Sequence, residues 1–126
     1  MHPNPHEDGF TLVELLIVIL IVGVLAAIAI PSFLHLRTPS YNAAMQSDLS
    51  SAVTAENAYG TDHGGFTSLV SDLTAEGYRT SQNVTPVHLK LVGSTFVACV
   101  KHDAVSTWLV YDGASGTTSD SASDCV

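Results

Sequence analysis

Glu14 lies inside an otherwise apolar stretch that runs from Phe10 to Ile30, and it is the only charged side chain in that stretch. A carboxylate in an apolar helix costs up to about 2.5–3.5 kcal/mol at the centre of a bilayer and less near its edge. Such a group either reaches the lipid headgroups or pairs with a positive charge. The partner that we expect is an amine on Phe10, which cleavage after Gly9 would create.

The histidines and the acidic tail are the other residues whose types suit chemistry, but their spacing does not define a site. The histidines are scattered without a zinc or metalloprotease motif, so we interpret them as surface residues. The tail aspartates do not have the spacing of an EF-hand calcium loop. The sequence therefore predicts no catalytic residue, no metal and no cofactor. The histidines are His2, His6, His35, His63, His88 and His102, and the aspartates are Asp112, Asp120 and Asp124.

The charge of the chain argues against nucleic acid as a direct partner. The formal net charge is -8, and the four basic residues, Arg37, Arg79, Lys90 and Lys101, do not cluster in the sequence. Binding to nucleic acid needs a basic patch that releases counterions. The acidic balance instead favours a soluble exterior for the part of the chain that follows the apolar stretch.

The apolar stretch is long enough to cross a membrane. At 1.5 Å per residue, a helix over residues 10–30 measures about 31 Å, roughly the thickness of the hydrocarbon core. A secretory signal peptide has a shorter apolar core with its cleavage site behind it. Here the composition changes in front of the core, at Gly9-Phe10. We therefore predict a leader over residues 1–9 and a transmembrane or filament-core helix over residues 10–30.

The helix is expected to continue over residues 31–60 with an amphipathic pattern. Met45, Leu49, Ala52, Val53 and Tyr59 lie near one face at helical spacing. A glycine at position 60 is well placed to end the helix. The remaining residues, 61–126, are expected to form a small globular head.

The head is expected to contain a short helix and three antiparallel strands. The helix is predicted over residues 68–76, with Leu69, Val70 and Leu73 inward. Alternating apolar residues predict strands over residues 87–91, 95–101 and 105–111. The tail over residues 112–124 is rich in Gly, Ser, Thr and Asp, a composition typical of a loose segment. The fold class is thus α+β, with the first helix packed on a three-stranded sheet.

The N-terminal sequence resembles that of type IV pilins and their pseudopilin relatives. The resemblance rests on the segment GFTLVELLIVI, which begins at Gly9, on Gly23, and on the segment AAIAIP, which ends at Pro31. It covers residues 9 to about 35, roughly a fifth of the chain. It differs in the leader, where Glu7 and Asp8 stand in place of the usual basic residues, so a cytoplasmic N-terminus is expected from the resemblance alone.

The resemblance implies a route of processing and assembly. A prepilin peptidase would cut between Gly9 and Phe10 and methylate the new amine on Phe10. Glu14 would neutralise the Phe10 amine of a neighbouring subunit. The partners implied are copies of the chain, other pilins, the peptidase, the inner-membrane assembly machinery and, before assembly, the lipid bilayer. The chain would be a single-pass protein of the cytoplasmic membrane first and part of an extracellular pilus fibre later.

Two helix-weakening residues lie in or beside the apolar stretch. Gly23 costs about 1 kcal/mol relative to alanine, and Pro31 removes a backbone hydrogen bond. We interpret them as points of helix flexibility that packing in a filament could use. A second kink or break is expected at Thr38-Pro39.

The two cysteines, Cys99 and Cys125, are expected to form a disulfide. A pair of cysteines in an exported domain is usually oxidised, and type IV pilins often fasten their C-terminal region in this way. The bridge would close a 27-residue loop and stabilise the head by about 3.5 kcal/mol in the chain-entropy model. The tail, with few apolar side chains, needs such a constraint.

Three classes of function fit these features, and the first is a structural subunit of a type IV pilus. The second is a pseudopilin of a type II secretion system, and a competence-type pilus subunit is a close variant of the first. The third is a membrane-anchored binding domain that never polymerises. The cysteine pair favours a pilin over a pseudopilin, which more often has a calcium loop in this region. Glu14 opposes a simple anchor, which gains nothing from a carboxylate in lipid.

Overall fold

The computed structural model describes residues 9–126, apart from the side chains of Leu34 and His35. The leader expected over residues 1–9 lies outside this range except for Gly9, and so do His2 and His6. The chain divides after Leu36 into an N-terminal unit and a C-terminal unit, Arg37–Val126. Each unit is described by itself below.

One long helix, α1, accounts for most of the N-terminal half of the sequence. It spans Leu12–His63 without interruption. The end expected at Gly60 is wrong, because Gly60 stays helical and packs against an aromatic ring. A Cβ atom at Gly60 would lie 3.1 Å from Cε1 of Phe66. The helix ends at Gly64, which has a φ of 74° and whose N–H donates to the carbonyl of Gly60 at 2.9 Å.

Both prolines of α1 are accommodated within the helix. The helix is assigned continuously across Pro31 and Pro39, so the break expected at Thr38-Pro39 is not observed. Each proline removes one hydrogen bond, and the bonds of the neighbouring residues hold the helix on either side. Near the first proline, the hydroxyl of Ser32 also donates to the carbonyl of Ile28 at 3.2 Å.

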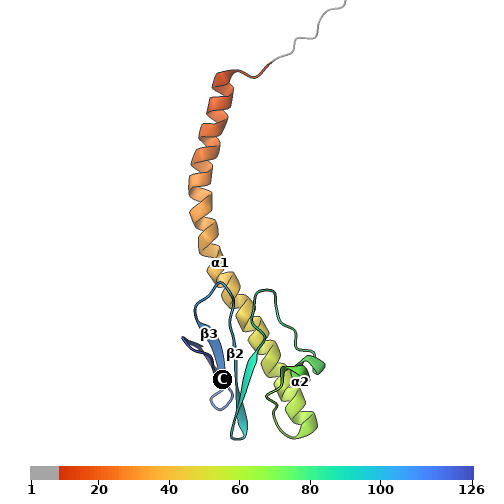
Figure 1. Cartoon of the computed structure of the whole chain (residues 1–126). Helices are drawn as coiled ribbons and strands as arrows, with labels where there is room; N and C mark the ends of the chain where they lie inside the picture. The colour runs from red at the N-terminus through yellow and green to blue at the C-terminus, as the bar shows by residue number, and fades with distance from the viewer. Residues whose placement is uncertain (1–8) are drawn as a thin grey trace, which may run out of the picture. The chain divides into compact units, whose positions relative to one another are not determined.

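The C-terminal unit contains a sheet of four antiparallel strands. The strands are β1 (His88–Val92), β2 (Thr95–Val100), β3 (Trp108–Asp112) and β4 (Thr117–Ser121). They pair in chain order, β1-β2-β3-β4, and each strand is antiparallel to the next. In Figure 1 the sheet lies against the C-terminal part of α1. The predicted α+β fold is confirmed, with four strands in place of three.

The core of this unit joins one face of α1 to one face of the sheet. The buried helix residues include Met45, Leu49 and Ala52, as the helical spacing predicts, whereas Val53 and Tyr59 are half-buried. They belong to the same apolar cluster as buried residues of the strands, among them Phe96, Ala98, Val100 and Leu109. Burial of these apolar side chains is the main force that holds the helix on the sheet.

The fourth strand corrects the expectation of a loose tail. Residues 117–121 pair with β3 in register, from Asp112 opposite Thr117 to Trp108 opposite Ser121. A turn connects the two strands, and Gly116 adopts a φ of 69° in it. The strand forms through backbone hydrogen bonds, which do not need apolar side chains, and four of its five residues stay exposed. The composition of the tail therefore does not predict this strand.

Two details of the predicted burial pattern are also wrong. The short helix α2 spans Val70–Ala75 and buries Leu73, whereas Leu69 before it is exposed. In β1, Leu89 is buried but Leu91 is exposed. Leu91 borders an open hollow whose walls include several glycines, which have no side chain to cover it.

Candidate functional site

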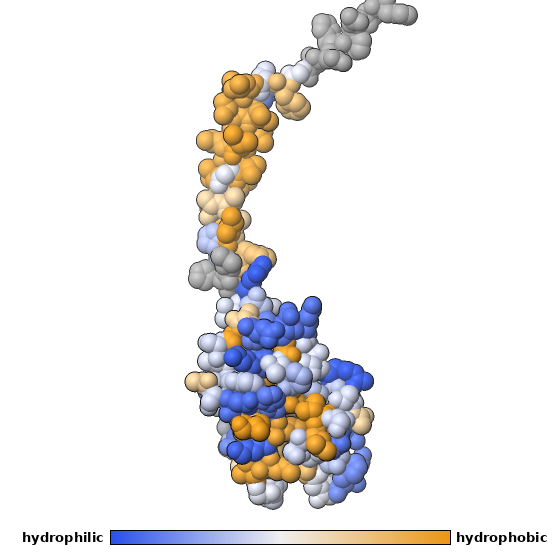
Figure 2. Space-filling model, in the orientation of Figure 1, coloured by the Kyte–Doolittle hydropathy of each residue, from blue (hydrophilic) through white to orange (hydrophobic). Residues whose placement is uncertain are grey.

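Within the described residues, the N-terminal part of α1 leaves its apolar side chains uncovered. From Leu12 to Ile30, no side chain is buried, and Leu15 to Ile17 are each more than half exposed. Figure 2 shows this segment as a nearly continuous apolar surface. Among the described residues, α1 is the helix that is long and apolar enough to cross a membrane. An apolar surface of this extent needs cover from lipid or from other protein chains.

The first turn of α1 holds Glu14 in a capping box with Thr11. The backbone N–H and the hydroxyl of Thr11 donate to Oε2 of Glu14 at 2.9 and 3.0 Å, respectively, and the Thr11 hydroxyl accepts from the N–H of Glu14 at 3.2 Å. This reciprocal arrangement satisfies donors that a helix N-terminus leaves free. Thr11 is a residue that our sequence reasoning missed, although the spacing Thr-x-x-Glu is the known signature of such a cap.

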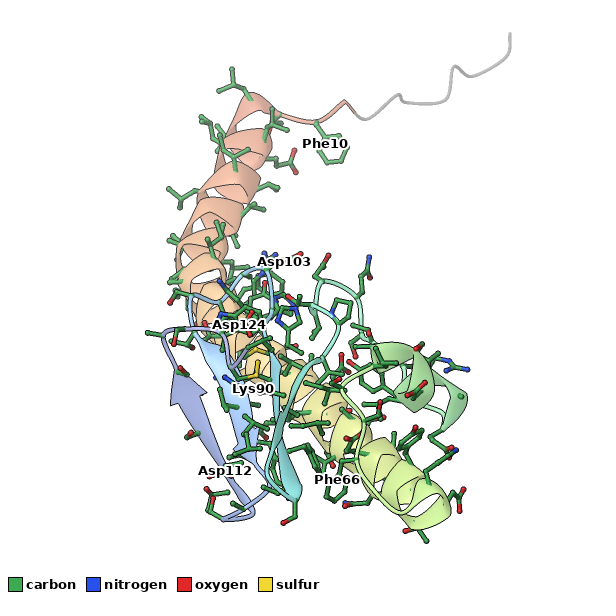
Figure 3. The ribbon with its side chains drawn as sticks, turned by 60° about the horizontal axis from the view of Figure 1, so that its bottom comes forward. Phe10, Phe66, Lys90, Asp103, Asp112 and Asp124 are labelled. Atoms are coloured by element: carbon green, nitrogen blue, oxygen red, sulfur yellow. A yellow bond between two sulfur atoms is a disulfide. The ribbon has the colours of Figure 1, made fainter. Side chains whose placement is uncertain are left out.

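The predicted cleavage site lies directly in front of this cap. Gly9 and Phe10 precede the helix and are exposed, Phe10 to 91%. Figure 3 shows Phe10 pointing away from the first turn of α1. A peptidase can reach such exposed, non-helical backbone. An amine created on Phe10 would lie beside the positive end of the helix dipole, which disfavours an uncompensated positive charge there.

Gly23 and Pro31, the predicted points of flexibility, are both exposed. A Cβ atom at Gly23 would meet no other atom within 4 Å. The subunit itself therefore does not require a glycine at position 23, and the proposed role of both residues rests on what surrounds the helix after assembly.

The disulfide between Cys99 and Cys125 is confirmed. Their sulfur atoms are bonded at 2.09 Å, and the bridge links buried β2 to the C-terminal tail. Figure 3 shows this bond close to Asp124, the residue before Cys125. The tail is thus held at both of its ends, by β4 pairing near its start and by the disulfide near its end.

Two of the histidines are not simple surface residues. His102 is 6% exposed and stacks on the ring of Tyr41, with the ring centroids 4.3 Å apart. His88 is half-buried, and its Nδ1 lies 2.6 Å from Oδ2 of Asp124. His63 is exposed, as expected. The expectation fails at His102 because the strands and the helix enclose it, which sequence spacing does not reveal.

Two buried carboxylates of α1 also escaped the sequence reasoning. Asp48 accepts hydrogen bonds from the N–H and the hydroxyl of Ser81, which fixes the loop before β1 to the helix. Glu56 is fully buried, and its Oε1 accepts from the N–H of Thr67 at 2.8 Å. Within the described residues, Oε2 of Glu56 has no hydrogen-bond partner. Burial raises the pKa of Glu56, the charge of Asp72 raises it further, and the hydrogen bond from Thr67 opposes the shift.

The raised pKa of Glu56 predicts a pH-dependent stability. The folded state holds the proton more tightly than the unfolded state, so this contribution is complete at low pH and is lost as pH rises through the folded pKa. Replacing Glu56 with Gln keeps an acceptor for Thr67 and removes the titration. We expect the variant to show a flatter dependence of the free energy of unfolding on pH between about pH 4 and 7. Urea melts over that range test this, and parallel curves for the two proteins would contradict it.

The comparisons with known proteins agree with this site. Residues 4–30 match the prokaryotic N-terminal methylation motif. The chain is 30% identical to the type IV wide pilus major component of Thermus thermophilus, over 95% of this chain and 98% of that protein. It is 37% identical to the competence protein ComGC of Bacillus subtilis, over 64% of this chain and 83% of that protein. The match to the type IV major pilin of Myxococcus xanthus is 34% identical and covers 56% of this chain but only 32% of that longer protein.

The exposed apolar segment of α1, its capped first turn and the antiparallel sheet are consistent with a pilin-like α+β fold. The likeness to the Thermus protein extends over nearly the full length of both chains. The chain belongs to the type IV pilin family, and it is a structural pilus subunit.

Proposed function

We propose that this chain is made as a precursor and assembles into a type IV pilus through its N-terminal helix. Before assembly, residues 10–30 anchor it in the cytoplasmic membrane as a single span. A prepilin peptidase then cuts between Gly9 and Phe10 and methylates the Phe10 amine, and the assembly machinery of the inner membrane extracts the subunit into an extracellular fibre. The chain acts as a structural subunit and not as an enzyme.

One observation supports this proposal most: the carboxylate of Glu14 lies within an apolar segment whose side chains are exposed. Lipid alone satisfies the apolar side chains but not a carboxylate. A bundle of equivalent helices covers the apolar surface and brings the Phe10 amine of one subunit near the carboxylate of another. The hydrogen bonds from Thr11 to Oε2 leave Oε1 of Glu14 available for such a partner. Copies of this chain and other pilins are therefore the partners that the site fits.

A competence-type pilus is a second candidate, favoured by the likeness to ComGC. The two candidates share processing, anchoring and polymerisation and differ in the task of the fibre. Deletion of the gene, followed by separate assays of surface motility and of DNA uptake, distinguishes them. Loss of uptake with normal motility would favour the competence fibre. The scattered basic residues make direct DNA binding by this subunit unexpected in either case.

The mature subunit is expected to begin at Phe10 with a methylated amine. The polar leader would otherwise carry charged residues into the apolar core of the fibre, at a large desolvation cost. Intact-mass measurement of subunits from sheared fibres tests this directly. The mass should correspond to residues 10–126 plus the one carbon and two hydrogens that a single N-methylation adds, and less the two hydrogens that the disulfide removes. A fibre subunit that retains residues 1–9 would overturn the processing step.

A further inference from the structure

Four side chains suited to a transition metal meet where the C-terminal tail crosses β1 and β2. His88 begins β1 and lies opposite Cys99 of β2, while Asp124 and Cys125 come from the tail. Oδ2 of Asp124 lies 2.6 Å from Nδ1 of His88, and its Oδ1 lies 3.2 Å from Sγ of Cys99. The ligand atoms of His88, Cys99 and Asp124 all lie within 4.8 Å of one another. Cys125 is not part of this group of three, but its sulfur is bonded to that of Cys99 and becomes available as a fourth ligand when the disulfide is reduced.

In the oxidised chain the two sulfurs are bonded to each other and are not thiolates. The chain is synthesised with two thiols, and the disulfide forms only when an oxidant removes two electrons and two protons from them. In the dithiol form both sulfurs can bind a metal after losing their protons. We propose that His88, Cys99, Asp124 and Cys125 bind one Zn²⁺ in the dithiol form, so that the metal site and the disulfide are alternative states of the same four residues.

The donor set favours zinc. Two thiolates, one imidazole and one carboxylate form a tetrahedral set for Zn²⁺, whereas calcium and magnesium prefer oxygen ligands. With Zn–S of about 2.3 Å and Zn–N or Zn–O of about 2.0–2.1 Å, the ligand atoms of such a site lie roughly 3.4–3.8 Å apart. In the oxidised chain the contacts from Asp124 are shorter than this, 2.6 Å to Nδ1 of His88 and 3.2 Å to Sγ of Cys99, so binding of zinc requires these groups to move apart by up to about 1 Å. The Cα atoms of the cysteines, 6.1 Å apart, allow both sulfurs to bind one ion.

The surroundings leave one side of the site open to solvent and shield its other side from water. His88 and Asp124 line an open hollow of about 400 Å³, through which an ion can approach. Cys99 lies behind them with no exposed surface, so the inner side of the site is closed to water. The ring of Trp108 lies 5.1 Å from that of His88. Trp108 is the only tryptophan in the sequence, so all of the tryptophan fluorescence comes from a ring beside this site.

The His88–Asp124 contact is compatible with a purely structural role, in which it holds the tail against β1. That role predicts no metal affinity and no effect of metal on the thiols. The metal site predicts that Zn²⁺ slows the formation of the disulfide, because bound thiolates are not free to attack an oxidant. The proposed metal site is a property separate from polymerisation and does not depend on it.

The test uses the full chain in detergent, reduced with a phosphine and titrated with Co²⁺, a spectroscopic substitute for Zn²⁺. We expect one Co²⁺ per chain, with the intense visible bands of a tetrahedral thiolate site, quenching of Trp108 fluorescence, and loss of both signals on addition of Zn²⁺. The oxidised chain should show neither. Histidines elsewhere in the chain would give weaker binding without thiolate bands.

Variants of His88 and Asp124 test whether these two residues bind the metal, and the comparison with the oxidised chain tests the two cysteines. His88→Ala and Asp124→Asn should each weaken Co²⁺ binding by at least about tenfold, while Asp120→Asn, an exposed change in the neighbouring strand β4, should have no effect. Asp124→Asn changes the side chain least, so it remains informative if His88→Ala fails to fold. Equal affinity in the Asp124→Asn and wild-type chains, or the same binding by the oxidised chain, would overturn the site. So would an oxidation rate that Zn²⁺ does not change.

Discussion

Replacing Glu14 with alanine is expected to lower the yield of fibres at least about tenfold, while membrane insertion and cleavage continue. Insertion should not suffer, because the change makes the span more apolar. The Gly9-Phe10 bond is untouched, so cleavage should survive. Assembly should fail because each arriving subunit would bring an unpaired positive amine into an apolar core, at a cost of several kcal/mol, and each 1.4 kcal/mol corresponds to a factor of ten.

Two further variants separate charge pairing from helix capping. Glu14→Asp keeps the charge but shortens its reach, so it should retain part of the wild-type yield. Thr11→Ala removes the hydroxyl that caps the helix, which costs about 1 kcal/mol, and leaves the Glu14 carboxylate in place. It should therefore assemble better than Glu14→Ala. Sheared fibres compared with membrane fractions give the readout, and a wild-type yield from Glu14→Ala would falsify the pairing role.

Removing the disulfide with the double change Cys99→Ala and Cys125→Ala is expected to lower the free energy of unfolding of the head by about 3.5 kcal/mol. The loop that the bridge closes has a sequence separation of 26 residues, and cross-linking it restricts the unfolded chain. The strand β4 should be affected most, since most of its side chains are exposed and contribute little burial. The double change also avoids leaving one reactive thiol behind.

Urea melts followed by Trp108 fluorescence measure this change, because Trp108 pairs with Ser121 of β4 in the sheet. Hydrogen exchange should show that protection in residues 117–121 falls further than in β2. The reduced wild-type chain, kept free of metal, should match the double variant. A loss of less than about 1 kcal/mol would mean that β4 pairing holds the tail without the bridge.

The sequence by itself determined the N-terminal half of this protein. An unbroken apolar run, one carboxylate near its start and a glycine before it are properties of local composition and spacing. They predict a membrane span and a processing site without reference to any distant residue. The helical spacing of Met45, Leu49 and Ala52 likewise predicted the buried face of α1, because a helix repeats every 3.6 residues wherever it lies.

The predicted end of α1 shows where such local reasoning stops. A glycine at position 60 suggests a helix end, yet Gly60 remains helical and the ring of Phe66 packs closely over it. Gly64, with a φ of 74°, follows the last helical residue, and spacing in the sequence does not distinguish the two glycines. The fourth strand is a similar case, since only β3 offers the backbone partners that order a polar tail.

Tertiary structure alone decided which polar residues are buried and which meet. Asp48 and Glu56 look like solvent-facing residues of an amphipathic helix, and the loops that cover them come from residues 67 and 81. The cluster of His88, Cys99 and Asp124 joins two strands and the end of the tail, segments that no spacing rule connects. Local patterns fix helices and spans because their interactions lie within a few residues, whereas a site built from distant segments exists only once the sheet has formed.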